Sequence, residues 1–261
     1  MPRHYSKPPL VEAIAEFQFN PTQAWDWTVP GRYYELLSAG YPKKRQQNVL
    51  ELTMQPGEGR IRQEVRSGVV RMQFLSEDEK SIVQTGADSL TFNQLPPYPG
   101  WEAFRTRIIE NIGQYVSLTS PAGIKMACLR YIDRVEIPDN GSIRLEEFFV
   151  VPPRVPPEAP QNFSAFAMEV DSRYSSPKMV MRYVFASNPP SVVGPAMLPL
   201  PAARPGSLNF VTDIGVWATG EDLPEIAGLQ TWLDTAHDRV ETLFDKSFTE
   251  RTHSEVFGEV S

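Results

Sequence analysis

The chain has 261 residues, 41% of them hydrophobic and 22% charged, which is typical of a folded globular protein and excludes a disordered one. Its net charge of −7 argues against a uniformly basic nucleic-acid-binding domain, and the second half of the chain carries most of the excess. No apolar run reaches the ~18 residues of a membrane-spanning helix, and the N-terminus lacks the apolar stretch of a secretory signal. A single cysteine, Cys128, cannot form an internal disulfide, so we expect a cytoplasmic protein with no membrane segment.

The first half of the chain predicts one strand, one helix, a meander and a second helix. Toward the end of residues 10–19, apolar and polar residues alternate, and this pattern predicts a strand. A helix is expected over 28–39, with a threonine as N-cap and a glycine and a proline after its end. Short alternating runs over 49–95, separated by turn residues, predict an antiparallel meander of four or five strands. Apolar residues recur at helical spacing over 101–118 and predict the second helix.

The second half repeats this order of elements without repeating the residues. A long strand is predicted over 125–137, a short helix at 145–149, a hairpin within 163–187 and another strand over 208–218. The last helix is expected to open at Asp222, where an acidic residue three positions later gives capping-box spacing.

Together these elements predict an α+β protein of two halves, residues 1–122 and 123–261, each an antiparallel sheet backed by helices. The order is β-α-β(4–5)-α in the first half and β-α-β(3)-α in the second, which indicates internal duplication of the element order. The two sheets could join into one continuous saddle like that of TATA-box-binding-protein-like folds. The 25 prolines are about twice the usual share of about 5%, and many fall in proline-rich loops at 151–160 and 188–206.

A third proline-rich stretch, LPPYPGWE at 95–102, lies between a predicted strand and a predicted helix. Proline-rich ligands are usually flanked by disordered sequence, so a stiff corner is the favoured interpretation, with Tyr98 and Trp101 packed under the helix. Pro99 fits the first helical turn, where its missing N–H costs nothing. A recognition role for the two aromatic side chains stays open.

Five segments in order resemble a sporadically distributed, uncharacterised family of bacterial and archaeal proteins of about 260 residues. They begin KPPLVEAIAEFQF and WDWTVPGRYYELL, continue with VQTGADSLTFNQLPPYPGWEAF, and end with LRYIDRVEIP and LEEFF. The last helix, WLDTAHDRVETLFDKSFTE, is similar to the closing helix of that family, whereas 150–220 shows no match. The resemblance implies kinship and length, and it supplies no catalytic residue.

The sequence contains none of the common motifs for metal binding, nucleophilic catalysis or nucleotide binding. Its three histidines, His4, His237 and His253, are scattered, and with one cysteine they are too few for a zinc site. His237 is expected on the solvated side of the last helix. No nucleophile elbow, P-loop or dinucleotide fingerprint occurs, so we expect no metal and no cofactor.

One polar cluster is the best candidate for a site. Alternation along the strand around 130 places Arg130, Arg134 and Glu136 on one face. Glu12 and Glu16 share a face of the first strand and could meet these arginines if the two strands pair. A structural salt-bridge ladder is the favoured interpretation, and an anion site built from arginine forks is the alternative.

We expect a non-catalytic protein-interaction or regulatory module with a protein partner. The first alternative is a nucleic-acid-associated protein that binds through a basic sheet face, although the net charge disfavours it. The second alternative is an enzyme with a novel site near Arg130 and Arg134. The candidate interaction surface consists of these residues: Arg60, Arg62, Arg66, Arg71, Tyr98 and Trp101.

Overall fold

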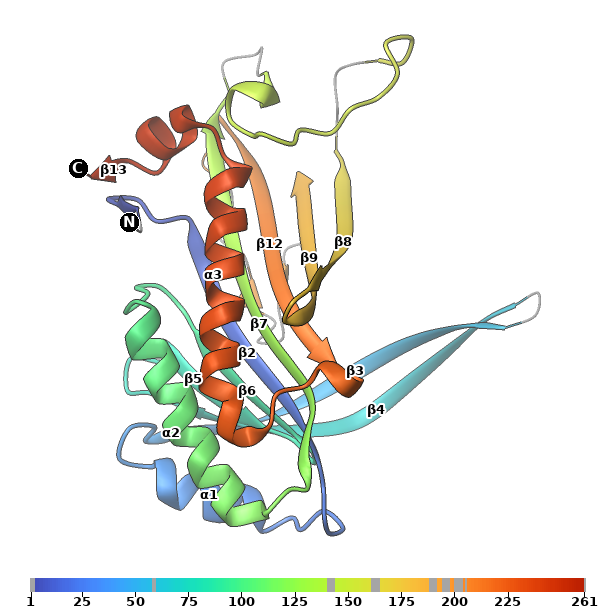
Figure 1. Ribbon diagram of the computed structural model, residues 1–261, viewed down its shortest axis with the longest axis vertical. Coiled ribbons are helices and arrows are strands. Elements are labelled where there is room, and N and C mark those ends of the chain that lie inside the picture. The colour runs from blue at the N-terminus through green and yellow to red at the C-terminus, as the bar shows by residue number, and fades with distance from the viewer. Residues whose placement is uncertain are drawn as a thin grey trace. The chain divides into compact units, whose positions relative to one another are not determined.

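A computed structural model of the protein describes residues 3–57, 60–139, 144–160, 165–187, 192–193, 198–199, 204 and 206–260. Within 48–70 and at 192–193 and 198–199 it describes the backbone alone. The chain combines helices with antiparallel sheet (Figure 1), which confirms the predicted α+β class. No helix among the described residues is both long enough and apolar enough to cross a membrane.

Nine strands form the main sheet, and their bounds are β2 Leu10–Asn20, β3 Lys43–Gly57, β4 Arg60–Leu75, β5 Ser81–Thr85, β6 Ser89–Gln94, β7 Gly123–Pro138, β8 Ala167–Ser175, β9 Lys178–Ser187 and β12 Ser207–Thr219. Their order in the sheet is β3-β4-β5-β6-β2-β7-β12-β9-β8. Strands of both predicted halves therefore belong to one sheet. Two small sheets pair β1 (His4–Tyr5) with β13 (Glu259–Val260), and β10 (Val192–Val193) with β11 (Leu198–Pro199).

Three α-helices accompany the sheet: α1 Val29–Leu37, α2 Trp101–Thr119 and α3 Leu229–Ser247. Shorter turns of helix occupy Leu145–Glu147, Gly220–Asp222, Ile226–Gly228 and Thr252–Val256. The predicted start of the last helix at Asp222 is wrong. A 3-10 turn ends there, Pro224 follows, and Gly228 is the residue that caps α3.

By its internal contacts the chain divides into two compact units. We call residues 15–127 with 225–227 the N-terminal unit, and residues 1–14, 128–224 and 228–261 the C-terminal unit. The first 14 residues thus belong with the second half of the chain.

In the N-terminal unit, α1 and α2 cover one face of the sheet, and aromatic rings fill the space between. Tyr33 of α1 packs against Phe74 of β4 and Tyr115 of α2, with ring centroids 6.0 and 5.5 Å apart. Phe19 of β2 meets the same Tyr115 at 5.1 Å. The predicted meander has four strands here, because two of the predicted runs are one long strand, β4, paired with β3 along its whole length.

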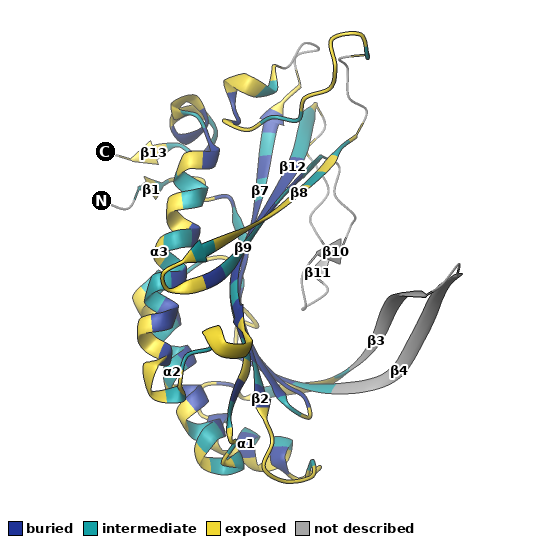
Figure 2. Cartoon of the chain, turned by 45° about the vertical axis from the view of Figure 1, so that its right-hand side comes forward, coloured by how far each residue is buried: buried dark blue, intermediate teal, exposed yellow. Residues whose placement is uncertain are grey.

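In the C-terminal unit, the apolar face predicted for the last helix is largely buried. Leu243 and Phe244 are half-buried, and the buried members are Leu229, Trp232, Leu233, Ala236, Val240 and Phe248. Beside the end of α3 a phenylalanine cluster of Phe149, Phe185, Phe210 and Phe248 joins four separate segments. The predicted hairpin is confirmed, since β8 and β9 pair from Ala167 with Ala186 to Ser175 with Lys178. Figure 2 shows how buried residues follow β2, β7 and β12 while the outer surfaces of the helices stay exposed.

Candidate functional site

The predicted arginines of β7 take part in internal ion pairs within the C-terminal unit. Arg130 forks onto Asp213 of β12, with its Nε 2.5 Å from Oδ1 and its Nη2 bonded to Oδ2. Arg134 donates from Nε to Asn209 at 2.9 Å and from Nη2 to Glu136. Each of these two guanidinium groups therefore already faces a carboxylate of the protein itself.

The two predicted acidic partners fall in different units. Glu12 belongs to the C-terminal unit and is 2% exposed. Burial lowers the pKa of Arg130, whereas the carboxylate of Asp213 and, to a smaller extent, that of Glu12 raise it, and the net pKa lies above its ordinary value. Glu16 belongs to the N-terminal unit and is half-buried.

A further carboxyl group in β7, which the sequence analysis did not single out, faces the opposite side of the strand. Asp133 is 3% exposed, and its Oδ2 has no hydrogen-bond partner among the described residues. The buried hydroxyl of Thr212 lies close enough to this carboxyl group to lower its pKa to a small extent. Burial, together with the charge of Asp213, raises the pKa of Asp133 to about 8. This carboxyl group is consequently held in its neutral form through most of the physiological range.

The proline-rich corner at 95–102 joins β6 to α2. Tyr98 and Trp101 are half-buried, and both meet the buried ring of Phe104 edge to face, at 6.0 and 6.5 Å. The placement of Pro99 in the first turn is wrong, because α2 begins at Trp101 and its cap is Gly100, whose φ of 93° an L-residue rarely adopts.

The structure describes only one side chain of the predicted basic face on β4. Arg60, Arg62 and Arg66 lie in β4, but their side chains fall outside the described residues. Arg71, in the same strand, is half-buried, and its Nε has no partner among the side chains that are described.

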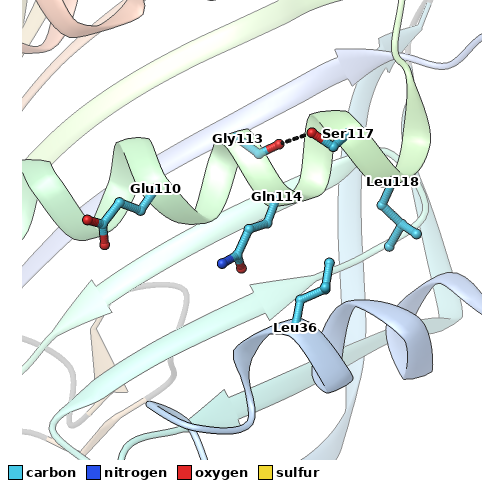
Figure 3. A pocket seen from close by; sticks show the side chains of 6 residues that line it. All are labelled: Leu36, Glu110, Gly113, Gln114, Ser117 and Leu118. Atoms are coloured by element: carbon cyan, nitrogen blue, oxygen red, sulfur yellow. Dashed lines mark hydrogen bonds between the residues drawn. The ribbon is translucent and has the colours of Figure 1, made fainter.

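A surface hollow of about 460 Å³ lies between α1 and α2 in the N-terminal unit (Figure 3). We call it the α1–α2 groove, and its lining residues are Leu36, Glu110, Gly113, Gln114, Ser117 and Leu118. Leu36 points from α1 toward Gln114 and Leu118 of α2. The residue is 50% exposed, so about half of its surface faces the hollow or solvent. Gly113 contributes no side chain, so the middle of α2 leaves the hollow open.

The groove continues into a polar end of about 270 Å³, which shares Leu36, Glu110 and Gln114 with it. Besides Glu110 and Gln114, the polar side chains that line this end are Tyr41, Ser76, Ser81, Arg107 and Asn111. The Tyr41 hydroxyl lies 3.2 Å from that of Ser81, and Asn111 donates to Tyr41 at 3.5 Å.

Neither the groove nor its polar end was predicted. Its residues come from a helix, a strand edge and a second helix, and only their packing brings them together. One local signal exists in the sequence, because Gly113 interrupts a helix at an interior position. Leu36 gives none, since its spacing assigns it to the apolar stripe of α1, and only the structure shows that it is not buried with Tyr33 and Leu37.

The histidine of α3 does not lie in solvent as predicted. The side chain of His237 is 15% exposed, and its Nδ1 lies 3.1 Å from the hydroxyl of Tyr131 on β7. The expectation failed because α3 turns this position toward the sheet. No group of three or more potential metal ligands gathers among the residues that the structure describes.

No protein-family model matches the chain, and no curated protein has a sequence that matches it.

Proposed function

We propose that this protein is a non-catalytic protein-interaction module, and that the α1–α2 groove is its docking surface. The observation that carries the proposal is the pairing of a half-exposed leucine on α1 with a side-chain-free position on α2, within one continuous hollow. Apolar surface of this kind, rimmed by polar residues, is typical of sites that receive a partner.

The groove has the chemistry to receive an apolar side chain of a partner protein. Leu36 and Leu118 supply aliphatic walls, and Gly113 supplies space between them. Glu110 is exposed, and it is the charged residue among the six that line the apolar part of the hollow. A partner segment with an apolar anchor and a basic neighbour would complement both features.

The test is affinity capture from the native lysate at moderate salt, with the wild-type chain and two variants as bait. Leu36→Glu places a charge in the groove, whereas Val170→Glu places the same charge on another exposed apolar residue, in the C-terminal unit. We expect one protein that is captured in stoichiometric amount by wild type and by Val170→Glu, and lost with Leu36→Glu. The same pattern must recur with that protein purified. Equal capture by all three baits, or capture of no protein at all, would refute the proposal.

A further inference from the structure

At the polar end of the α1–α2 groove, Arg107 forms no ion pair with a described residue, and the nearest acidic residue of the lining is Glu110, one helical turn on. The Nη1 of Arg107 donates to the Ser81 hydroxyl at 2.7 Å, its Nη2 to the Gln94 side chain at 2.6 Å, and its Nε to the backbone carbonyl of Ala103 at 3.4 Å. All three acceptors are neutral. A half-buried guanidinium held by neutral groups favours an anion, above all a planar carboxylate.

The groups around Arg107 are held in place before any ligand binds. Tyr41, Ser81 and Asn111 are each less than 10% exposed and are linked to one another by hydrogen bonds. Tyr33 fixes the backbone of Asn111 through a hydrogen bond of 2.9 Å from its hydroxyl. Such pre-organised polar groups reduce the entropic cost of binding.

A second polar group of the groove, on Gln114, lacks a hydrogen-bond donor. The side-chain oxygen of Gln114 is buried and has no hydrogen-bond partner among the described residues. Gln114 lines both the apolar groove and the polar end, and in Figure 3 its amide points into the space between α1 and α2. An unpaired acceptor in this position calls for an N–H donor.

We propose that the groove binds the free C-terminus of a partner protein. The terminal carboxylate meets Arg107, the backbone N–H of the last residue meets the oxygen of Gln114, and the last side chain, an apolar one, enters the space beside Leu36 and Gly113. This inference rests on the proposed function and names what the docking surface recognises.

A chain terminus satisfies all three requirements within one residue, which is why we prefer it to other carboxylates. A small carboxylate would fill only the polar end and would leave the apolar groove empty. An internal aspartate or glutamate has its carboxylate on the side chain, so it offers no second side chain for the groove. Glu110 at the rim adds a preference for a basic residue upstream of the terminus.

The experiment uses two fluorescent peptide pools and the full-length protein. Both pools contain acetylated hexapeptides with mixed residues at the first five positions and leucine, valine, isoleucine, methionine or phenylalanine at the last. One pool ends in a free carboxylate and the other in an amide, and binding is followed by fluorescence anisotropy. We expect the free-acid pool to bind at least about tenfold more tightly, as a charge-assisted hydrogen bond implies.

Two variants and one small probe complete the test. Arg107→Gln should abolish the difference between the pools, whereas Arg154→Gln, the same change at an exposed position of the C-terminal unit, should preserve it. Equal binding of both pools, or binding of neither, would overturn the inference. Binding of N-acetyl-leucine as tight as that of the peptides would also overturn it, in favour of a small-molecule site.

The outcome separates this inference from the proposed function. If the captured partner depends on Leu36 but its amidated terminus binds as well as the free one, the docking surface stands and C-terminal recognition falls. If Leu36→Glu leaves capture unchanged, the proposed function falls, whatever the peptides show.

Discussion

Arg130 of β7 and Asp213 of β12 face each other across neighbouring strands, and the guanidinium engages both carboxylate oxygens. The side chains are 32% and 11% exposed, so the pair is largely removed from water. Gly215 lies beside the stem of Arg130, where an added Cβ would stand 3.5 Å from Cγ. The pair therefore acts as a structural tie between two strands that are far apart in the sequence.

Asp213→Asn should lower the free energy of unfolding by roughly 2 kcal/mol, because it leaves the Arg130 charge half-buried without its counter-charge. The loss is smaller than the ~3–5 kcal/mol of a fully buried pair because Arg130 keeps some solvent contact. Urea denaturation of wild type and Asp213→Asn measures this difference in the free energy of unfolding. In the double variant Arg130→Met/Asp213→Leu most of the loss should disappear, and a double variant less stable than Asp213→Asn would contradict this interpretation.

Asp133 should make stability depend on pH. Its pKa is raised to about 8 in the folded state, against an ordinary value near 4 in the unfolded chain. Between these values the folded state retains a proton that the unfolded state releases, so stability falls as the pH rises from about 4 to about 8. Thermal unfolding across this range should show a steeper decline for wild type than for Asp133→Asn. Parallel profiles for the two proteins would show that Asp133 is not the group responsible.

Trp101→Ala should destabilise the protein by about 1–2 kcal/mol, because the indole covers the buried ring of Phe104 at the start of α2. The effect is below the ~3–5 kcal/mol of a fully buried tryptophan, since Trp101 is only half-buried. Thr106→Ala, at an exposed position of the same helix, is the control and should change stability by less than about 0.5 kcal/mol. Unchanged stability together with lost partner binding would assign Trp101 to recognition instead.

The elements that depend on local patterns could be predicted from the sequence. The alternation that ends at Pro138 predicts β7, and the apolar spacing after Trp101 predicts α2. The start of α3 could not be predicted in this way. The capping-box pattern at Asp222 suggests a helix there, but Pro224 and Gly228 follow, and the backbone forms two short turns before α3 begins.

The candidate site was less accessible to sequence reasoning. Arg130 and Arg134 could be identified from alternation, but their partners Asp213 and Asn209 lie about 80 residues away and reach them only through the pairing of β7 with β12. The same holds for the α1–α2 groove, whose existence depends on how two helices pack and not on any periodicity within either one.

The nucleic-acid alternative makes a separate prediction. If the basic residues of β4 bind phosphates, the protein should bind duplex DNA or RNA at low ionic strength, with an affinity that falls steeply with salt. We expect no such binding, because the net charge is −7. Salt-dependent binding that a quadruple alanine variant of Arg60, Arg62, Arg66 and Arg71 abolishes would establish the alternative.

The most direct test of the docking surface is to fill it without unfolding the protein. A Cβ at Gly113 meets no atom within 4 Å, and replacing a glycine inside a helix stabilises it by roughly 0.5–1 kcal/mol. Gly113→Leu should therefore raise the melting temperature while its side chain occupies the groove, and Gly113→Ala is the control that gains stability with little added volume.

The measurement is calorimetric titration of the captured partner, once purified, with wild type, Gly113→Ala and Gly113→Leu. The docking surface predicts at least about tenfold weaker binding for Gly113→Leu despite its higher melting temperature, and near-normal binding for Gly113→Ala. Wild-type affinity in the Gly113→Leu variant would show that the partner binds elsewhere, and the central claim would fail.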